Sequence, residues 1–224
     1  MMVFRVPGVY RPQADTWLLA ETIRRCALPP GGRVLDLCAG TGVLGCTAAG
    51  LLGSHVTAAD ISRRALMSSW LNCRVRGVPV RLVRGGPESV CRVAPFDLVV
   101  TNPPYVPARA AVGRGRAVAW DAGPDGRSVL DRLCAVLPAL LSERGVALIV
   151  HSALSDTERT LAQLRTGVAH ASVVARATVP FGPVLRSRAR WLAARGLIDE
   201  TQQTEELVVI RAQREPSAEL EAIP

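Results

Sequence analysis

Short apolar runs alternate along the chain with segments whose apolar residues recur at helical spacing. The runs predict strands, and the longer periodic segments predict helices. Strand followed by helix indicates parallel βαβ units in a sheet covered on both faces. We expect strands over residues 34–38, 56–59, 80–83, 96–101, 145–151, 171–179 and 206–211, and helices over residues 15–28, 42–53, 62–76, 125–141 and 157–166.

The chain has 224 residues, which suits one domain with a full core. We expect that domain to span residues 1–214, with an N-terminal motif and helix over residues 1–30. Residues 215–224 are acidic and are predicted to be disordered. Residues 180–205 form an Arg-rich connection between the last two strands and show no clear helix.

Charge and cysteine content narrow the function classes. The net charge is +8, but every basic residue is Arg, which points to codon bias more than to a polyanionic partner. The six Cys form no C-x-x-C pair, so no metal site is expected. Apolar stretches are too short to span a membrane, and residues 1–12 do not resemble a secretory signal, so we expect a cytoplasmic protein.

A glycine-rich turn follows the first predicted strand. Gly40, Gly42 and Gly45 satisfy G-x-G-x-x-G, and Asp60 ends the next strand, where it can accept hydrogen bonds from ribose hydroxyls. A dinucleotide-binding protein would show the same spacing. Asp36, four residues before the first glycine, would repel a pyrophosphate but suits the ammonium group of S-adenosyl-L-methionine.

The segment Asn102-Pro103-Pro104-Tyr105 directly follows the fourth predicted strand and carries the strongest chemical signal. Proline removes N–H donors and leaves carbonyl acceptors. The Asn102 amide oxygen and the Pro103 carbonyl can together accept both N–H bonds of one –NH2 group, and Tyr105 can stack on a planar acceptor. Gripping both N–H bonds aims the nitrogen lone pair at a methyl donor, so the segment predicts methylation of a planar nitrogen.

Together these residues resemble class I methyltransferases of the HemK/PrmC type, in particular their single-domain archaeal and eukaryotic relatives. The segment from Val9 to Thr16 is similar to that group's N-terminal motif, and Ala119-Trp120, Gly123, Gly126 and Asp131 are similar to the segment after its catalytic loop. The resemblance implies a Rossmann-like α/β fold with a seven-stranded, mostly parallel sheet, an antiparallel last strand and helices on both faces. It assigns catalysis to Asn102, Pro103 and Tyr105, and S-adenosyl-L-methionine binding to Thr16, Asp36, Gly40, Gly42, Asp60, Ile61 and Asn102.

The sequence departs from that family in three places. The helical N-terminal domain of bacterial release-factor methyltransferases is missing. Gly85-Gly86-Pro87 stands where the family has an Asp for the adenine amine. The connection over residues 180–205 is longer than usual. Either its arginines dock a substrate, namely Arg186, Arg188, Arg190 and Arg195, or the segment simply covers a face of the core through Leu185, Trp191 and Leu192.

The resemblance favours methylation of a glutamine amide of a protein, such as a peptide release factor. The alternatives are an adenine-N6 methyltransferase of RNA or DNA, with Arg residues on the phosphates, an NAD-binding oxidoreductase, and a non-catalytic cofactor-binding subunit. The archaeal and eukaryotic relatives pair with a small zinc-binding activator at a strand edge, which corresponds here to residues 78–83. No membrane partner is expected.

Overall fold

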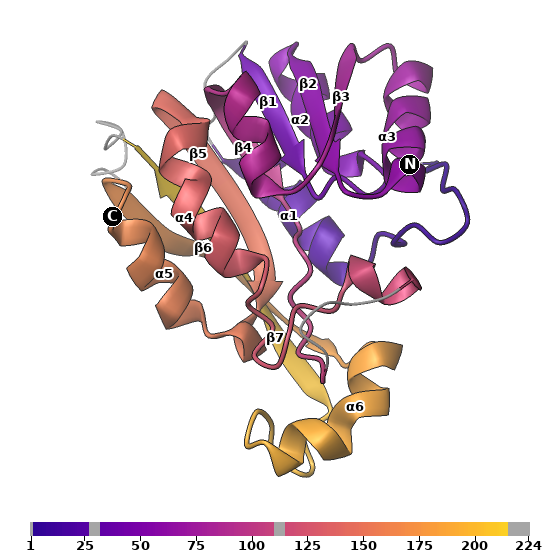
Figure 1. Cartoon of the computed structure of the whole chain (residues 1–224), viewed down its shortest axis with the longest axis vertical. Helices are drawn as coiled ribbons and strands as arrows, with labels where there is room; N and C mark the ends of the chain where they lie inside the picture. The colour runs from indigo at the N-terminus through magenta and orange to yellow at the C-terminus, as the bar shows by residue number, and fades with distance from the viewer. Residues whose placement is uncertain (1, 27–31, 110–114, 215–224) are drawn as a thin grey trace.

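A seven-stranded mixed sheet organises the chain, as a computed structural model that describes residues 2–26, 32–109 and 115–214 shows (Figure 1). The strand order is β3-β2-β1-β4-β5-β7-β6. Only β7 runs antiparallel to its neighbours, which confirms the expected fold class. The strands are β1 (Arg33–Leu37), β2 (His55–Asp60), β3 (Val80–Arg84), β4 (Phe96–Thr101), β5 (Leu141–Ser152), β6 (His170–Pro180) and β7 (Thr204–Gln213).

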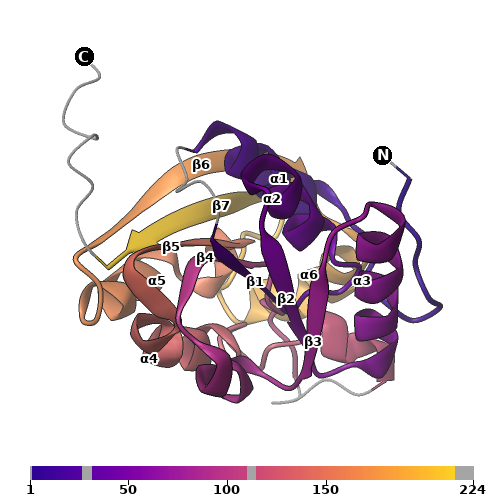
Figure 2. The same ribbon diagram turned by 90° about the horizontal axis from the view of Figure 1, so that it is seen from above.

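Helices cover both faces of the sheet. One face carries α1 (Ala14–Arg25), α2 (Val43–Leu52) and α3 (Arg63–Val75), and the other carries α4 (Leu130–Leu140), α5 (Thr157–Arg165) and the 3-10 helix η1 (Pro87–Val93). Figure 2 shows α1 on the opposite side of the sheet from α4 and α5. Two further 3-10 turns, η2 (Gly115–Ala119) and η3 (Ala153–Ser155), flank the loops that follow β4 and β5.

The strands contribute alternate residues to two cores. In β4, Val99 packs into the core beneath α4 and α5, while Leu98 and Val100 pack into the core beneath α1 and α2. Successive side chains of a strand point to opposite faces, so a strand buried on both faces is a continuous apolar run. This explains why central strands such as β1 and β4 are found within a few residues of their expected bounds.

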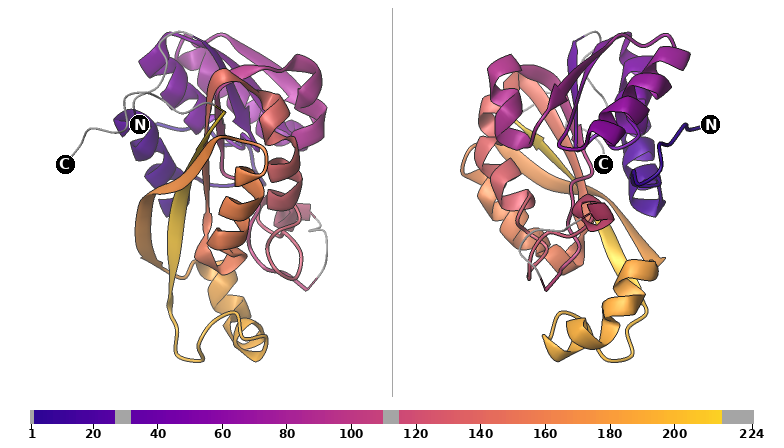
Figure 3. Two further views of the ribbon diagram at one scale, coloured as in Figure 1. Left: turned by 90° about the vertical axis from the view of Figure 1, so that its left-hand side faces the viewer. Right: turned by 45° about the vertical axis from the view of Figure 1, so that its right-hand side comes forward.

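The Arg-rich connection contains a helix, so the prediction of no clear helix there was wrong. This helix, α6 (Pro183–Ala194), projects below the sheet between β6 and β7 (Figures 1 and 3). Pro183 occupies the first turn, where its missing N–H costs nothing. Leu185 and Leu192 lie two turns apart on the buried face and pack with Phe181 and Ile198 in a third, smaller core.

Other boundaries shift for local reasons. The helix predicted from residue 125 begins at Leu130, because Gly126 adopts φ +75° and cannot continue into the helix. Pro138 lies inside α4, which ends two residues later, as expected for a proline that ends a helix. The expected end of the first helix at residues 27–28 and the tail at 215–224 lie outside the described residues. Within those residues, no helix is both long and apolar enough to cross a bilayer.

Candidate active site

A cavity of about 1590 Å³ opens at the carboxyl ends of the parallel strands. Strand order reverses between β1 and β4, and open α/β sheets bind ligands at such a switch point. The cavity wall combines the N-terminal segment, the glycine turn, the loop after β4 and the start of α6. Of the predicted site residues, it includes Thr16, Gly40, Asp60, Ile61, Asn102, Pro103 and Tyr105.

Backbone amides of the turn hold the Asp60 carboxylate in place. The Gly40 N–H donates to Asp60 Oδ2 at 3.0 Å, and the Ser62 N–H donates to Oδ1 at 2.8 Å. Gly40 and Gly42 both have left-handed φ values, and a Cβ on Gly42 would lie 2.8 Å from the Ser69 Cα. Glycine is therefore required at Gly42, where the turn meets α3.

Asp36 lies beneath the turn and is not among the residues that line the cavity. It is fully buried, and its Oδ2 accepts from the Gly45 N–H at 2.9 Å. Its Oδ1 has no hydrogen-bond partner among the described residues, and burial raises its pKa. This unpaired oxygen suits a positively charged ligand. Because Asp36 lies beneath the glycine turn, the turn would separate its carboxylate from a ligand in the cavity. Cys38, with φ +58°, occupies the wall in its place.

The expected adenine end of the cavity has no carboxylate from the segment after β3. Gly85, Gly86 and Pro87 line it, and Pro87 begins η1. Ile61, half exposed beside Asp60, offers an apolar surface to a planar ring. The residues present therefore suit adenine through apolar and backbone contacts, in line with the departure noted from the sequence.

Two side chains, those of Asp15 and Thr16, fix the orientation of the Asn102 amide. The Thr16 hydroxyl donates to Asp15 Oδ1 at 3.1 Å, because a carboxylate can only accept. Thr16 Oγ1 then accepts from Asn102 Nδ2 at 3.2 Å. The NH2 end of Asn102 therefore faces Thr16, and its oxygen remains available to a ligand in the cavity.

Asp15 connects the N-terminal segment to the loop after β4. Its Oδ2 accepts from the hydroxyls of Tyr10 at 2.8 Å and Tyr105 at 3.0 Å, and its Oδ1 accepts from the Thr16 N–H at 2.6 Å. Burial raises the pKa of both tyrosines, which keeps them protonated as donors. Asp15 belongs to the N-terminal motif found in the sequence, but its part in the site was not predicted.

Tyr105 is more enclosed than the expected stacking role suggests. It is 8% exposed, its ring belongs to the core beneath α4 and α5, and its hydroxyl is committed to Asp15. Its carbonyl accepts from the Ser155 hydroxyl at 2.7 Å. These contacts make Tyr105 an anchor of the loop, with only a small part of the ring on the cavity wall.

Gly126 supports the same carbonyl from behind. A Cβ at this position would lie 2.3 Å from the Tyr105 carbonyl oxygen and 2.6 Å from Ser155 Oγ. Gly126 also has φ +75°, so both space and backbone conformation demand glycine. This accounts for Gly126 in the segment that resembles the HemK family.

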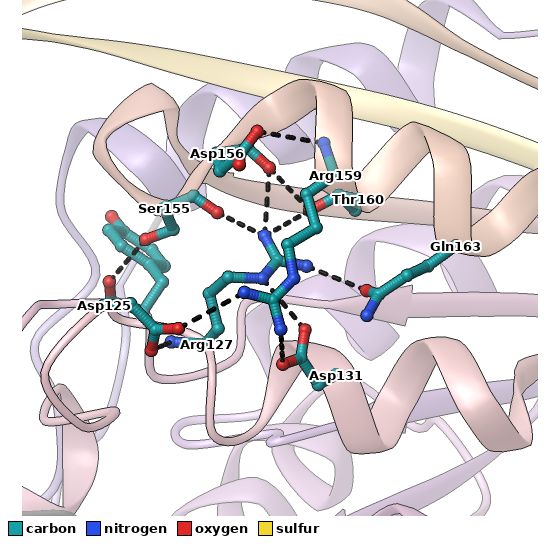
Figure 4. A network of polar contacts seen from close by, with 9 residues as sticks. Asp125, Arg127, Asp131, Ser155, Asp156, Arg159, Thr160 and Gln163 are labelled. Atoms are coloured by element: carbon teal, nitrogen blue, oxygen red, sulfur yellow. Dashed lines mark hydrogen bonds and ion pairs between the residues drawn. The ribbon is translucent and has the colours of Figure 1, made fainter.

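A buried guanidinium, that of Arg127, fixes the position of Ser155 (Figure 4). Arg127 is 1% exposed and forms an ion pair with Asp131 at 2.9 Å. Its remaining donors bind two carbonyls and two side chains, those of Ser155, Asp156, Thr160 and Gln163. The network joins the loop after β4 to η3 and α5, and sequence reasoning missed it apart from Asp131.

The α6 region adds a wall to the site that was not predicted from the sequence. Arg188 donates to the Pro107 carbonyl at 2.9 Å and pairs with Asp121 at 2.7 Å, which ties α6 to the loop after β4. Leu185 and Leu192 are buried, whereas Arg186 and Arg190 are exposed. The insertion thus covers a core, contributes Pro183, Val184 and Leu185 to the cavity wall, and presents positive charge on its exposed side.

Comparisons with known proteins assign the chain to a family. Residues 3–178 match the family described as Methyltransferase small domain. A Methanocaldococcus jannaschii relative that carries the name protein N5-glutamine methyltransferase is 29% identical over 78% of this chain and 88% of its own length. Mouse Methyltransferase HEMK2 is 32% identical over 70% of this chain and 78% of its own length. The release factor glutamine methyltransferase of Deinococcus radiodurans is 34% identical over 84% of this chain and 66% of its own length.

Solved structures agree on the fold. The 16S rRNA N2 G1207 methyltransferase RsmC of T. thermophilus, solved with AdoMet and guanosine, matches with a TM-score of 0.62. The match covers 94% of this chain and 46% of that one at 19% identity, so it bears on architecture alone. The family match favours methyl transfer over the NAD-binding alternative. The chain belongs to the Methyltransferase small domain family and is, as its motifs predict, a HemK-type methyltransferase.

Proposed function

We propose that this enzyme transfers the methyl group of S-adenosyl-L-methionine to the side-chain amide nitrogen of a glutamine in a protein. The observation that carries this proposal is the fixed orientation of Asn102, whose amide oxygen is left for the acceptor by the hydrogen bond from Nδ2 to Thr16. An acceptor oxygen held there selects an N–H donor. A peptide release factor is the protein substrate that we favour, because relatives carry that name.

The loop after β4 positions the nucleophile. Asn102 Oδ1 and the Pro103 carbonyl accept the two N–H bonds of the acceptor amide, which draws its nitrogen toward a pyramidal geometry with an outward lone pair. Fixed alignment of two reactants supplies roughly 7–11 kcal/mol of a barrier. Bound S-adenosyl-L-methionine supplies an electrophilic methyl carbon on its sulfonium, so this chain needs no metal for the transfer.

The residues present fit that cofactor. Asp60, held by two backbone amides, keeps lone pairs for ribose hydroxyls, and Ile61 offers an apolar surface to adenine. The orphaned Asp36 Oδ1 provides negative charge behind the turn for the ammonium group. Gly40, which lines the cavity, allows close approach of the ligand to the backbone, while Gly42 lets the turn pack against α3. Thr16 and Asn102 also line the cavity and would lie beside the methyl group of the bound cofactor.

An adenine amine is the second candidate acceptor. It also presents two N–H bonds on a planar nitrogen, and the exposed Arg186 and Arg190 of α6 would favour a phosphate backbone. The enclosed Tyr105, however, leaves little ring face for stacking a flipped base. This observation is why we rank the glutamine amide first.

We also propose that the outer edge of β3 is where a small activator chain would pair, as the resemblance to archaeal and eukaryotic relatives implies. β3 is an edge strand of the sheet, and Leu82 on it is 39% exposed. Edge strands present unpaired backbone groups that can receive another chain.

Labelled cofactor in a cell extract tests the proposal. Purified enzyme is incubated with extract and S-adenosyl-L-methionine carrying a labelled methyl group, and the products are split by nuclease and by protease. Label that survives nuclease and is released by protease supports a protein acceptor. Label lost only on nuclease treatment supports the adenine alternative, and the absence of transfer with intact cofactor binding supports a non-catalytic subunit.

A further inference from the structure

One end of the cavity is lined by the residues that follow β2 and β3 and by Arg132 of α4. Ile61 comes directly after β2, and Gly85 and Gly86 come directly after β3. The Gly85 N–H donates to the Asp60 carbonyl at 3.1 Å, which joins the ends of these two strands. A base whose ribose is held by Asp60 would therefore pass Ile61 and reach the segment after β3.

The Arg132 guanidinium lies against the backbone of Gly86. Its Nη2 is 3.1 Å from the point where a Cβ on Gly86 would lie, so the absence of a side chain there leaves this space to the guanidinium. Arg132 is in the first turn of α4, and α4 packs against η1, which begins at Pro87. Cys38, which lines the cavity from the end of β1, is an electrostatic neighbour of Arg132. Arg132 therefore contributes its charge to this end of the cavity.

Glu88 holds the guanidinium plane in one orientation. Its two carboxylate oxygens accept from Arg132 Nε at 2.7 Å and from Nη2 at 2.6 Å, a two-point pairing that fixes a planar group. The third nitrogen, Nη1, forms no hydrogen bond with the residues that the structure describes. Glu88 itself is not among the residues that line the cavity. Since a guanidinium can only donate, the polar side chain offered to a ligand at this end is a donor.

We propose that Arg132 is a specificity-determining residue of the cofactor site, which donates a hydrogen bond to the purine base of S-adenosyl-L-methionine. The inference rests on the proposed function, because it concerns the cofactor of that reaction. A guanidinium reads acceptor atoms of the base, such as a ring nitrogen, whereas a carboxylate would read the exocyclic amine. Hypoxanthine keeps the ring acceptor N7 and has an oxygen in place of the amine. This chain should therefore accept a cofactor whose adenine is replaced by hypoxanthine.

Calorimetry with two cofactor analogues tests this inference without any methyl acceptor. The ligands are S-adenosylhomocysteine and S-inosylhomocysteine, in which an oxygen replaces the amine of the base. For the wild type we expect the two Kd values to agree within a few-fold. A site that reads the amine rejects the inosine analogue, because a polar group of the site is then left unpaired. A Kd for the inosine analogue more than about tenfold higher than that for the adenosine analogue overturns the inference.

Arg132→Met should weaken the binding of both analogues by roughly 10–100-fold, as for the loss of a hydrogen bond from a charged group. The side chains of Arg132 and Glu88 are 55% and 48% exposed, so the variant should keep the stability of the wild type.

Arg159→Met is the matched control for Arg132→Met. Arg159 is 45% exposed and pairs with Asp131, the residue before Arg132, but it is not among the residues that line the cavity. Its Kd values should equal those of the wild type. Equal affinities in the two variants overturn the inference and leave the proposed function standing. Failure of the wild type to bind either analogue contradicts the proposed function, and the inference falls with it.

Discussion

Asn102 Nδ2 donates a hydrogen bond to Thr16 Oγ1 at 3.2 Å, and this contact determines which end of the Asn102 amide faces the cavity. The hydroxyl of Thr16 is itself directed by the Asp15 carboxylate. The orientation of the Asn102 side chain is therefore set by Thr16 in the first turn of α1, which lies 86 residues earlier in the chain. The same carboxylate holds Tyr105, so one buried acid fixes both ends of the loop.

Substitution of Asn102 should separate catalysis from cofactor binding. Asn102→Ala removes a preorganised acceptor for the substrate N–H, and loss of one such contact typically lowers kcat by about 10²–10³-fold. Because the glycine turn and Asp60 are untouched, we expect S-adenosylhomocysteine affinity within a few-fold of wild type. Single-turnover methylation and calorimetry measure the two quantities. Unchanged transfer by Asn102→Ala would remove the Asn102 mechanism.

Thr16 should act through the orientation of Asn102. Thr16→Val is nearly isosteric but cannot accept from Asn102 Nδ2, so the amide is free to rotate. We expect kcat to fall by about tenfold, the value of one neutral hydrogen bond. Thr16→Ser keeps the hydroxyl and should restore most of the rate. If Val and Ser variants have the same kcat, the hydroxyl does not orient the amide.

Gly126 should tolerate no side chain. Gly126→Ala combines a left-handed backbone with a Cβ placed against the Tyr105 carbonyl, so we expect unfolding free energy to fall by about 2–4 kcal/mol. Gly53→Ala is the control, since Gly53 has φ +62° but a Cβ added there would meet no described atom within 4 Å. Urea denaturation should show a clearly smaller loss there. Equal losses would mean that only the backbone conformation matters.

The buried Arg127 should matter far more than its exposed neighbour Arg159. Arg127→Met leaves two carbonyls and Asp131 without their partner, and breaking a buried pair from one side costs about 3–5 kcal/mol. Arg159 is 45% exposed in its ion pair with Asp131, so Arg159→Met should cost less than about 1 kcal/mol. Chemical denaturation of both variants gives the comparison, and similar losses would contradict the role assigned to Arg127.

His151 should make stability depend on pH. It is fully buried in β5, and burial lowers its pKa to about 4 from 6.5. Between these values the unfolded chain takes up a proton that the folded chain does not, so stability is lost as pH falls from 6.5 to 4, by at most about 3 kcal/mol. Glu205, whose pKa is raised, acts in the opposite direction, so the measurement is the difference between wild type and His151→Gln at each pH. A difference that does not change with pH would contradict the assignment.

The sequence predicts the sheet well because its signals are local. The apolar run over residues 96–101 coincides with β4, and the glycines before α2 mark the turn whatever else surrounds them. The helix α6 escaped prediction because the six residues between Leu185 and Leu192 include three Arg and hide the apolar face. The burial of these two leucines depends on Phe181 and Ile198, which reach them only in the folded chain.

The candidate site was predictable where a motif lies in one loop and unpredictable where the fold joins distant segments. Asn102 and Asp60 each follow a strand, which places them at the carboxyl edge of the sheet. Asp15 meets Tyr105 from 90 residues away, and Glu205 arrives on the last strand. Nothing in the sequence around Glu205 indicates that this residue lines the cavity.

The fate of the transferred methyl group tests the central claim most directly. A protein methylated with labelled S-adenosyl-L-methionine is hydrolysed in strong base, and the volatile product is identified. Methylation on a glutamine amide nitrogen releases the label as methylamine, which is the result that we predict. Release as methanol would indicate a methyl ester, and label retained in the hydrolysate would indicate another atom. Either result would contradict transfer to the amide nitrogen held by Asn102 and Pro103.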